Sequence, residues 1–142
     1  MKTEIEKNKE VVKRFNKEVI EEGNSVTASD IFDPAFVNHS APPGADSGPS
    51  GMINTFNNIL KPAMPDLKVT ILEQIGEGDL VTTRKTISGT HTGTFMGIAA
   101  TGEQVNIDVI DVVRVRGEKY FEHWGINTLP SVLAQLSKKQ SK

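Results

Sequence analysis

Cysteine is absent from the 142-residue chain, and so are long apolar runs. The lack of cysteine excludes disulfides, zinc–thiolate sites, iron–sulfur clusters and cysteine nucleophiles. No stretch approaches the roughly 18 apolar residues of a membrane-spanning helix, so a membrane protein is not expected. The first ten residues, MKTEIEKNKE, lack the apolar core of a secretory signal. We therefore expect a cytoplasmic protein.

Neither positive nor negative charge is in large excess. The 16 Lys and Arg residues oppose 18 Asp and Glu residues, for a formal net charge of −2. Such a balance does not support general binding to a phosphate backbone, so nucleic acid is not an expected partner. Hydrophobic residues make up 37% of the chain, enough for one core at this length. No linker or repeat divides the sequence, and we treat residues 1–142 as a single domain.

Helical periodicity dominates the first half of the chain. Apolar residues recur at a spacing of three to four over residues 4–22, and Gly23-Asn24 ends this helix. A shorter helix is predicted over residues 26–32. A third helix is predicted after the Pro/Gly/Ser-rich loop 40–51, with Ser47 as its N-cap.

From Leu67 onwards the apolar period changes from 3.6 to 2. The alternation predicts strands over residues 67–75, 80–90, 105–116 and 119–127. A two-residue turn joins the last two strands, and Thr128 is a candidate cap for a final helix. Helices first and antiparallel strands last indicate an α+β fold, in which N-terminal helices cover a bent antiparallel sheet. This arrangement leaves a pocket between the two layers.

The turn at Gly117-Glu118 sets the predicted register of the last two strands. With this turn, Asp111 lies opposite Trp124, and Val113 lies opposite Glu122. Alternation then places both carboxylates on one mostly apolar face, beside the only tryptophan of the chain. One extra residue in either strand would move them to opposite faces.

Asp111 and Glu122 are the candidate catalytic residues. If their face lines the pocket, burial and mutual repulsion raise the pKa of at least one carboxyl group. A carboxyl group with a raised pKa can act as a general acid or base near neutral pH. The alternative interpretation is that both acids pair with Arg84, Arg114 or a backbone donor and only anchor the sheet.

Four further residues are candidates for substrate binding. Trp124 offers an indole ring for stacking on a flat ligand, and Arg84 offers a guanidinium group for a carboxylate or phenolate. The alternative for Arg84 is an ion pair with Glu73. His39 follows an apolar run and is a pocket candidate or a structural hydrogen-bonding residue, and His123 is the fourth candidate. The histidines are scattered and lack metal-binding motifs, so no metal site is expected.

Several segments of the sequence form a recognisable series. The most distinctive are GTHTGTFMGI at residues 89–98 and Glu122-His123-Trp124 before a leucine-rich helix. Residues 8–24 and Met64-Pro65-Asp66-Leu67 belong to the same series. In this order, the segments resemble the SnoaL-like polyketide cyclases, also called the ester cyclase family. The resemblance extends from about residue 5 to residue 137.

The resemblance implies a nuclear transport factor 2-like (cystatin-like) fold, a cone with a ligand cavity, and a homodimer formed through the sheet. It also implies intramolecular aldol cyclisation of a polyketide ester without a metal or organic cofactor. In the family, an acidic residue removes a proton next to a carbonyl group. The position of this catalytic aspartate, directly after the His-Trp pair, is occupied here by Gly125.

These observations lead to two main functional hypotheses. The first is an enzyme that cyclises or isomerises a small apolar carbonyl compound, with Asp111 or Glu122 as the acid/base. The second, motivated by Gly125, is a non-catalytic protein that binds an apolar or aromatic molecule in the same cavity. A related hydrolase or hydroxylase-type activity is a third hypothesis, because one fold hosts many chemistries.

Overall fold

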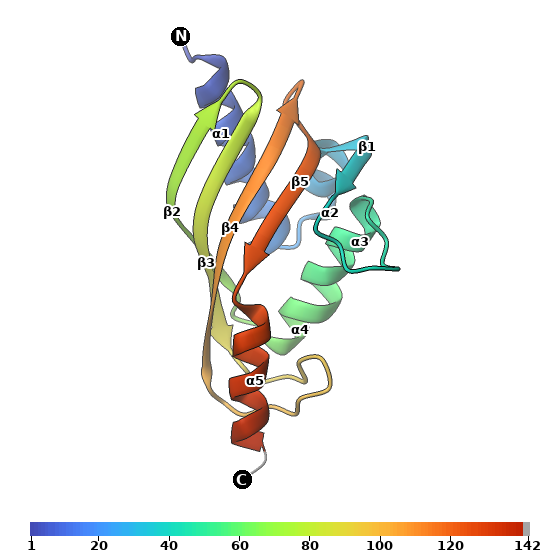
Figure 1. Ribbon diagram of the computed structural model, residues 1–142, viewed down its shortest axis with the longest axis vertical. Helices are drawn as coiled ribbons and strands as arrows, with labels where there is room; N and C mark the ends of the chain where they lie inside the picture. The colour runs from blue at the N-terminus through green and yellow to red at the C-terminus, as the bar shows by residue number, and fades with distance from the viewer. Residues whose placement is uncertain (141–142) are drawn as a thin grey trace.

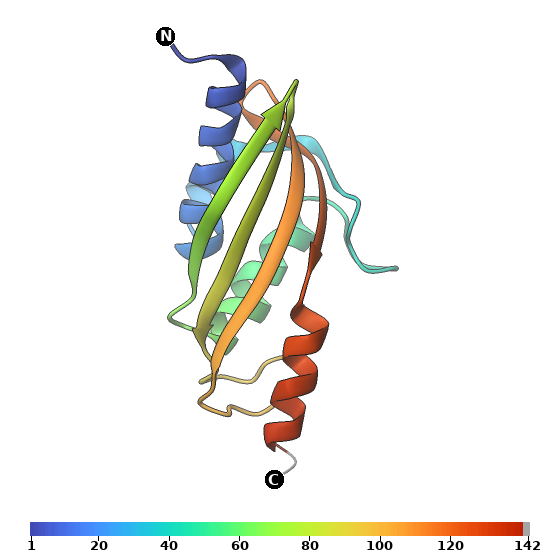
Figure 2. The same ribbon diagram turned by 60° about the vertical axis from the view of Figure 1, so that its left-hand side comes forward.

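The computed structural model describes residues 1–140; the predicted domain also includes residues 141 and 142, which lie outside the described residues. Five strands form one curved sheet, and helices cover one of its faces (Figures 1 and 2). The start of the chain and the end of its last helix lie at opposite ends of the molecule (Figure 1). This arrangement confirms the predicted α+β architecture. Among residues 1–140, no helix is long and apolar enough to cross a membrane.

The first helical segment is continuous, as predicted for residues 4–22. α1 (Glu4–Arg14) runs directly into the π-helical segment η1 (Phe15–Glu21). Thr3 and Glu6 form a capping box, which pairs backbone N–H groups that the first turn leaves free. The buried side chains of Val12 and Phe15 face the sheet layer, as the apolar spacing indicates.

Two further helical segments precede the sheet meander. α2 (Ser25–Ile31) is capped by the side chain of Asn24. α3 (Pro49–Asn54), η2 (Thr55–Leu60) and α4 (Lys61–Ala63) form one continuous helix. Its N-cap is Gly48, so the prediction of Ser47 as the cap is wrong. The carbonyl oxygen of Ser47 instead accepts a hydrogen bond from the backbone of Asn38, which fixes the preceding loop.

The sheet has the strand order β1-β5-β4-β3-β2. Four strands form an antiparallel meander close to the predicted positions: β2 (Lys68–Glu77), β3 (Leu80–Thr90), β4 (Gln104–Arg116) and β5 (Lys119–Asn127). The sequence pattern does not predict β1 (Phe32–Asn38), which pairs with β5 in parallel and with an irregular register. Pro34 lies in this strand, and proline is confined to edge strands of this kind. α5 (Leu129–Gln140) follows β5.

A bulge in β5 changes the predicted register of the last hairpin. The two-residue turn at Gly117-Glu118 is confirmed, with positive φ angles of 56° and 62° as in a type I′ turn. At Phe121, however, the register shifts by one residue, so that Asp111 lies opposite Gly125 instead of Trp124. The predicted register is therefore wrong beyond the first two pairs. Because strand side chains alternate, one extra residue turns all the following side chains to the other face.

An aromatic cluster fills the space between the helices and the inner face of the sheet. The rings of Phe15 and Tyr120 are stacked, with centroids 4.1 Å apart. Phe32 packs edge-on against Phe15 at 5.4 Å and against Phe36 at 4.8 Å. These rings are buried, and edge-to-face pairs of this kind stabilise a core beyond simple area burial. They tie η1 to β1 and β5 at one end of the cavity described next.

Candidate functional site

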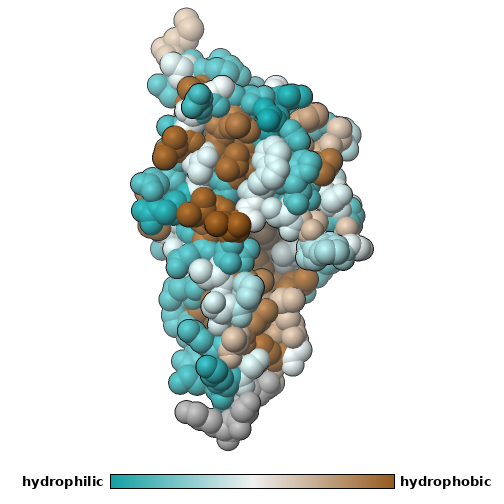
Figure 3. Space-filling model, in the orientation of Figure 1, coloured by the Kyte–Doolittle hydropathy of each residue, from teal (hydrophilic) through white to brown (hydrophobic). Residues whose placement is uncertain are grey.

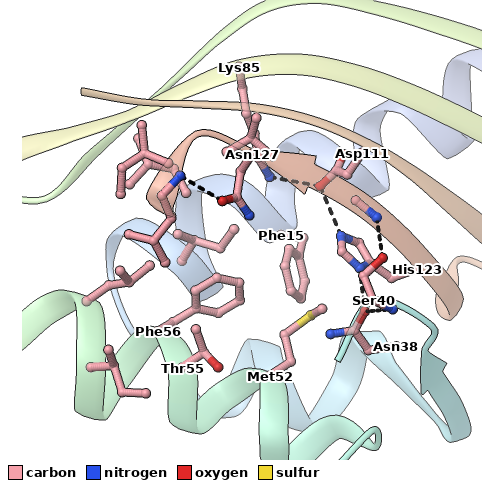
Figure 4. Close-up of a pocket in the computed structure, with 18 of the residues that line it drawn as sticks. Phe15, Asn38, Ser40, Met52, Thr55, Phe56, Lys85, Asp111, His123 and Asn127 are labelled. Carbon is pink, nitrogen blue, oxygen red and sulfur yellow. Dashed lines mark hydrogen bonds and ion pairs between the residues drawn. The ribbon is translucent and has the colours of Figure 1, made fainter. Parts of the chain in front are cut away.

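A cavity of about 320 Å³ lies between the inner face of the sheet and the helices (Figure 4). This volume is at the lower end of the range for small-molecule sites. Most of the wall is apolar and includes Phe15, Met52, Phe56, Ile107 and Val109. Polar side chains gather on the wall formed by the strands (Figure 4). The cavity therefore combines an apolar body with one polar side.

Three titratable side chains from neighbouring strands meet on this polar wall. Lys85 of β3 and His123 of β5 both reach Oδ2 of Asp111 on β4 (Figure 4). The Lys85 Nζ atom lies 3.2 Å from that oxygen, and the His123 Nε2 atom lies 3.3 Å from it. The side chains of Lys85 and Asp111 are only 4% and 6% exposed. The β5 bulge brings His123 to this wall, because it turns the ring to the inner face.

Lys85 is also held from the helical layer. Its Nζ atom donates a hydrogen bond of 2.6 Å to Oδ1 of Asn16, and Nδ2 of Asn16 donates to the carbonyl oxygen of Val12 at 2.8 Å. Asn16 lies in η1, and π-helical segments occur often at functional sites. One carboxylate and one amide oxygen thus fix the buried ammonium group.

The hydrogen bonds of Asn38 determine which nitrogen of His123 carries a hydrogen. Nδ1 of His123 lies 2.8 Å from Oδ1 of Asn38, and the backbone N–H of Ser40 donates to the same oxygen at 3.0 Å. The Ser40 contact identifies this atom of Asn38 as an acceptor, so His123 Nδ1–H must donate to it. Nε2 is then the atom that can take up a proton, and it faces the Asp111 carboxylate.

The pKa of Asp111 lies below its usual value. Burial acts to raise the pKa of this carboxyl group, but the Lys85 ammonium and the contact with the His123 ring outweigh burial and lower it. The expectation of a raised pKa is therefore wrong for Asp111. Burial, with a smaller contribution from the Asp111 charge, raises the pKa of Tyr120 well above its usual value. At neutral pH the wall thus presents a carboxylate anion and a neutral phenol.

Three of the predicted site residues lie outside the cavity and contact one another elsewhere. Glu122 accepts a hydrogen bond of 2.7 Å from Arg114 Nε and lies 2.8 Å from Nε2 of His39. The His39 ring stacks on Trp124, with centroids 4.8 Å apart. The prediction that Asp111, Glu122 and Trp124 share the cavity is wrong, because the β5 bulge turns Glu122 and Trp124 to the outer face of the sheet.

The outer ion pairs agree with the alternative interpretation of the sequence. Arg84 Nε lies 2.8 Å from Oε1 of Glu73, and both side chains are about half exposed. Glu122 pairs with Arg114, as that interpretation expects. The hydrogen bond with His39, and next the one with Arg114, lower the pKa of Glu122, so a raised pKa is wrong here too. These residues anchor the sheet from outside.

Sequence reasoning missed Lys85, Asn16 and Asn38. The sequence does contain a signal for Lys85. It lies an even number of residues from Val81 and Ile87 on the same strand, so its side chain points inward with theirs. Asn16 and Asn38 gave no such signal, because their roles depend on contacts between segments far apart in the chain. Within residues 1–140, no group of three or more His, Asp and Glu side chains is placed to hold a metal ion.

Comparison with known proteins identifies the family. A family model described as SnoaL-like polyketide cyclase matches residues 10–136, most of the chain. The chain belongs to this family. No match was found among curated proteins.

Solved structures share the fold of this SnoaL-like chain. IdmH from Streptomyces antibioticus, a candidate polyketide cyclase, is 28% identical with a TM-score of 0.79, covering 92% of this chain and 98% of IdmH. AclR from Streptomyces galilaeus, a candidate hydroxylase, is 25% identical with a TM-score of 0.81, covering 94% and 98%. A Catenulispora acidiphila protein with a ketosteroid isomerase-like fold is 19% identical with a TM-score of 0.68, covering 90% and 92%. These likenesses confirm the predicted nuclear transport factor 2-like fold.

In this SnoaL-like chain, Gly125 occupies the position at which the family resemblance implies a catalytic aspartate. Its N–H donates a hydrogen bond of 2.7 Å to Oγ of Ser40. A Cβ atom at this position would lie 3.0 Å from Cε1 of His123 and 3.4 Å from Cβ of Asp111. The His123 ring therefore occupies space that a side chain at residue 125 would need. A side chain at residue 125 would require the His123 ring to shift by a few tenths of an ångström.

Proposed function

We propose that this chain is a cofactor-independent cyclase or isomerase that moves protons on a small, largely apolar carbonyl compound. His123 acts as the general base, and Asp111 stabilises the imidazolium ion that forms. The observation that carries the proposal is the contact of His123 Nε2 with the Asp111 carboxylate inside an apolar cavity. A carboxylate beside a base in a sheltered site stabilises the cation that the base becomes when it takes up a proton, which favours general base catalysis.

The proposed reaction begins at the carbon next to the substrate carbonyl. Its C–H bond breaks, the proton passes to Nε2 of His123, and the electron pair moves through the carbonyl group to leave an enolate oxygen. In an aldol-type cyclisation, the enolate carbon then bonds to a second carbonyl carbon of the same molecule. The alkoxide formed there takes the proton back from His123, so the base is regenerated.

This assignment changes the roles that the sequence suggested. Asp111 remains in the site, but as a charge partner, since a carboxyl group with a lowered pKa is ionised throughout the neutral range. Glu122, His39, Arg84 and Trp124 do not line the cavity, and the proposal gives them no contact with the substrate. The relatives named above include both a candidate cyclase and a candidate hydroxylase, so the reaction class depends on the site and not on the fold.

Deuterium exchange tests the proposal directly. The full chain is incubated in deuterated water with a panel of small aromatic and aliphatic ketones and esters, and NMR follows deuterium at the carbon next to the carbonyl. We expect accelerated exchange with the native protein and a loss of about 10²- to 10⁴-fold in His123→Gln. His39→Gln is the matched control, since His39 lies outside the cavity, and it should exchange at the native rate.

Gly125 supports one alternative, a protein that binds an apolar or aromatic molecule without turnover. This alternative predicts that ligands from the panel bind in the cavity but that none exchanges faster than in buffer. Such a result would reject the catalytic proposal. Exchange that depends on His123 would reject the binding-only alternative.

We also propose that two copies of the chain pair through the outer face of the sheet. Exposed aliphatic side chains lie on this face, and the fractions of Leu72, Ile110 and Ile126 that remain exposed are 49%, 45% and 71%. Hydrophobic patches over the strands are visible in Figure 3. Exposed apolar side chains gathered on one face are typical of a protein–protein contact.

A cytoplasmic location remains a prediction from the sequence.

A further inference from the structure

We propose that the ammonium group of Lys85 is an oxyanion-binding group, and that the cavity takes ligands with an acidic oxygen, such as enols and phenols, and holds them in their deprotonated form. The inference rests on the proposed function in that it concerns the same cavity and supplies a partner for the enolate oxygen. It gives Lys85 a role, and the cavity a class of ligand, that proton transfer to His123 does not by itself require.

The first support is the hydrogen-bonding capacity of Lys85. An ammonium group has three N–H donors, and buried donors in proteins are normally paired. Asn16 and Asp111 accept two of them, at 2.6 and 3.2 Å. Within the described part of the chain, no acceptor takes the third. Because Lys85 lines the cavity, an oxygen atom of a bound ligand can complete the set.

The second support is the position of Lys85 relative to the proposed base. Lys85 and His123 come from strands on either side of β4 and reach the same oxygen of Asp111 (Figure 4). The cation and the base thus flank one carboxylate within one cavity. Because both nitrogen atoms lie within 3.3 Å of the same oxygen, a ligand whose carbonyl oxygen binds Lys85 would have its neighbouring carbon close to His123. Removal of a proton and stabilisation of the resulting oxyanion need this pairing of groups.

The third support is charge balance. Before proton transfer, Lys85 is paired with Asp111, while His123 and the ligand are neutral. After transfer, the imidazolium ion of His123 lies against Asp111 and the new oxyanion lies against Lys85. Two ion pairs replace one, and the total charge of the buried group does not change. A site of low polarity favours such balance, because it penalises an unpaired charge strongly.

A phenol with a coloured anion, 4-nitrophenol, provides the test, because its absorbance reports how much of the bound molecule is ionised. At a pH where the free phenol is half ionised, we expect the ratio of phenolate to phenol in the native cavity to be at least about tenfold higher than in solution. Lys85→Met should abolish this preference. Arg84→Met removes a cation from the next residue of the same strand, on the outer face, and should leave the preference unchanged.

A second variant guards against a folding defect in Lys85→Met. The double variant Lys85→Met/Asp111→Asn removes both members of the buried ion pair, and binding of 4-nitroanisole, which cannot ionise, shows whether its cavity persists. A double variant that binds the ether but has lost the preference for phenolate supports the proposal. Native protein that binds 4-nitrophenol with the same ionisation as in solution would overturn it, whatever the variants do.

The two proposals fail in different ways. If deuterium exchange depends on His123 but the phenol is bound without added ionisation, Lys85 is not an oxyanion group and the proposed function survives. If the phenolate is bound through Lys85 but no carbonyl compound exchanges, the oxyanion site stands and the proposed function is wrong.

Discussion

Lys85 and Asp111 form an ion pair across neighbouring strands, with side chains that are 4% and 6% exposed. Removing one member of such a pair leaves an uncompensated charge in the interior, which is strongly destabilising. Removing both members together avoids this penalty. The relationship between these two residues therefore links the stability of the fold to the chemistry of the cavity.

The first prediction concerns the stability of this pair. Asp111→Asn should lower the free energy of unfolding by about 3–5 kcal/mol, since Lys85 loses its counter-charge. The double variant Lys85→Met/Asp111→Asn should regain much of this loss. Urea unfolding of the native chain, both single variants and the double variant forms a complete cycle. Additive effects of the two single substitutions would show that the pair is not coupled.

The second prediction is acid sensitivity. The pKa of Asp111 is lowered in the folded chain, so the ionised carboxylate favours folding. This contribution is complete above the unfolded pKa of about 3.9 and is lost as the pH falls through the lower folded value. Urea unfolding between neutral pH and about pH 3 should show a steeper loss of stability for the native chain than for Lys85→Met/Asp111→Asn. If the free energy of unfolding depended equally on pH in both proteins, the prediction would be contradicted, because their other acidic residues are the same.

The third prediction concerns Gly125. Gly125→Ala should lower the free energy of unfolding by about 1–3 kcal/mol, because a Cβ atom there lies 3.0 Å from the His123 ring. Gly125→Asp should displace the ring further and reduce deuterium exchange, although it restores the acid that the family resemblance places there. NMR signals of the His123 ring would report the displacement. Faster exchange in Gly125→Asp would show that the acid at this position, and not His123, supplies the base.

The fourth prediction concerns association of two copies. Ile110 and Ile126 lie opposite each other on β4 and β5 and are exposed on the outer face. Ile110→Glu places a charge in the proposed contact and should convert a dimer into a monomer in sedimentation experiments. Val26→Glu is the control, since Val26 is an exposed aliphatic residue on α2, outside the proposed contact, and it should leave the dimer intact. A native chain that sediments as a monomer at all concentrations would reject the proposed contact.

Patterns along the chain predict most of the elements and the fold class. The change of apolar period at Leu67, the helix end at Gly23-Asn24 and the Gly117-Glu118 turn depend on local chemistry, so they could be read without coordinates. The strands of the meander lie close to where the alternation places them. Asp111 was also placed correctly, because the regular alternation of β4 is not interrupted.

The composition of the site depends on contacts that form only when the chain is folded. The extra residue at Phe121 has no clear signature in the sequence, yet it moves Glu122 and Trp124 outward and His123 inward. The hydrogen bond from Lys85 to Asn16 joins residues 69 positions apart, and the one between His123 and Asn38 joins residues 85 apart. Local patterns fix which residues form strands and helices. Which side chains meet depends on register and long-range packing, and a single inserted residue reverses the outcome.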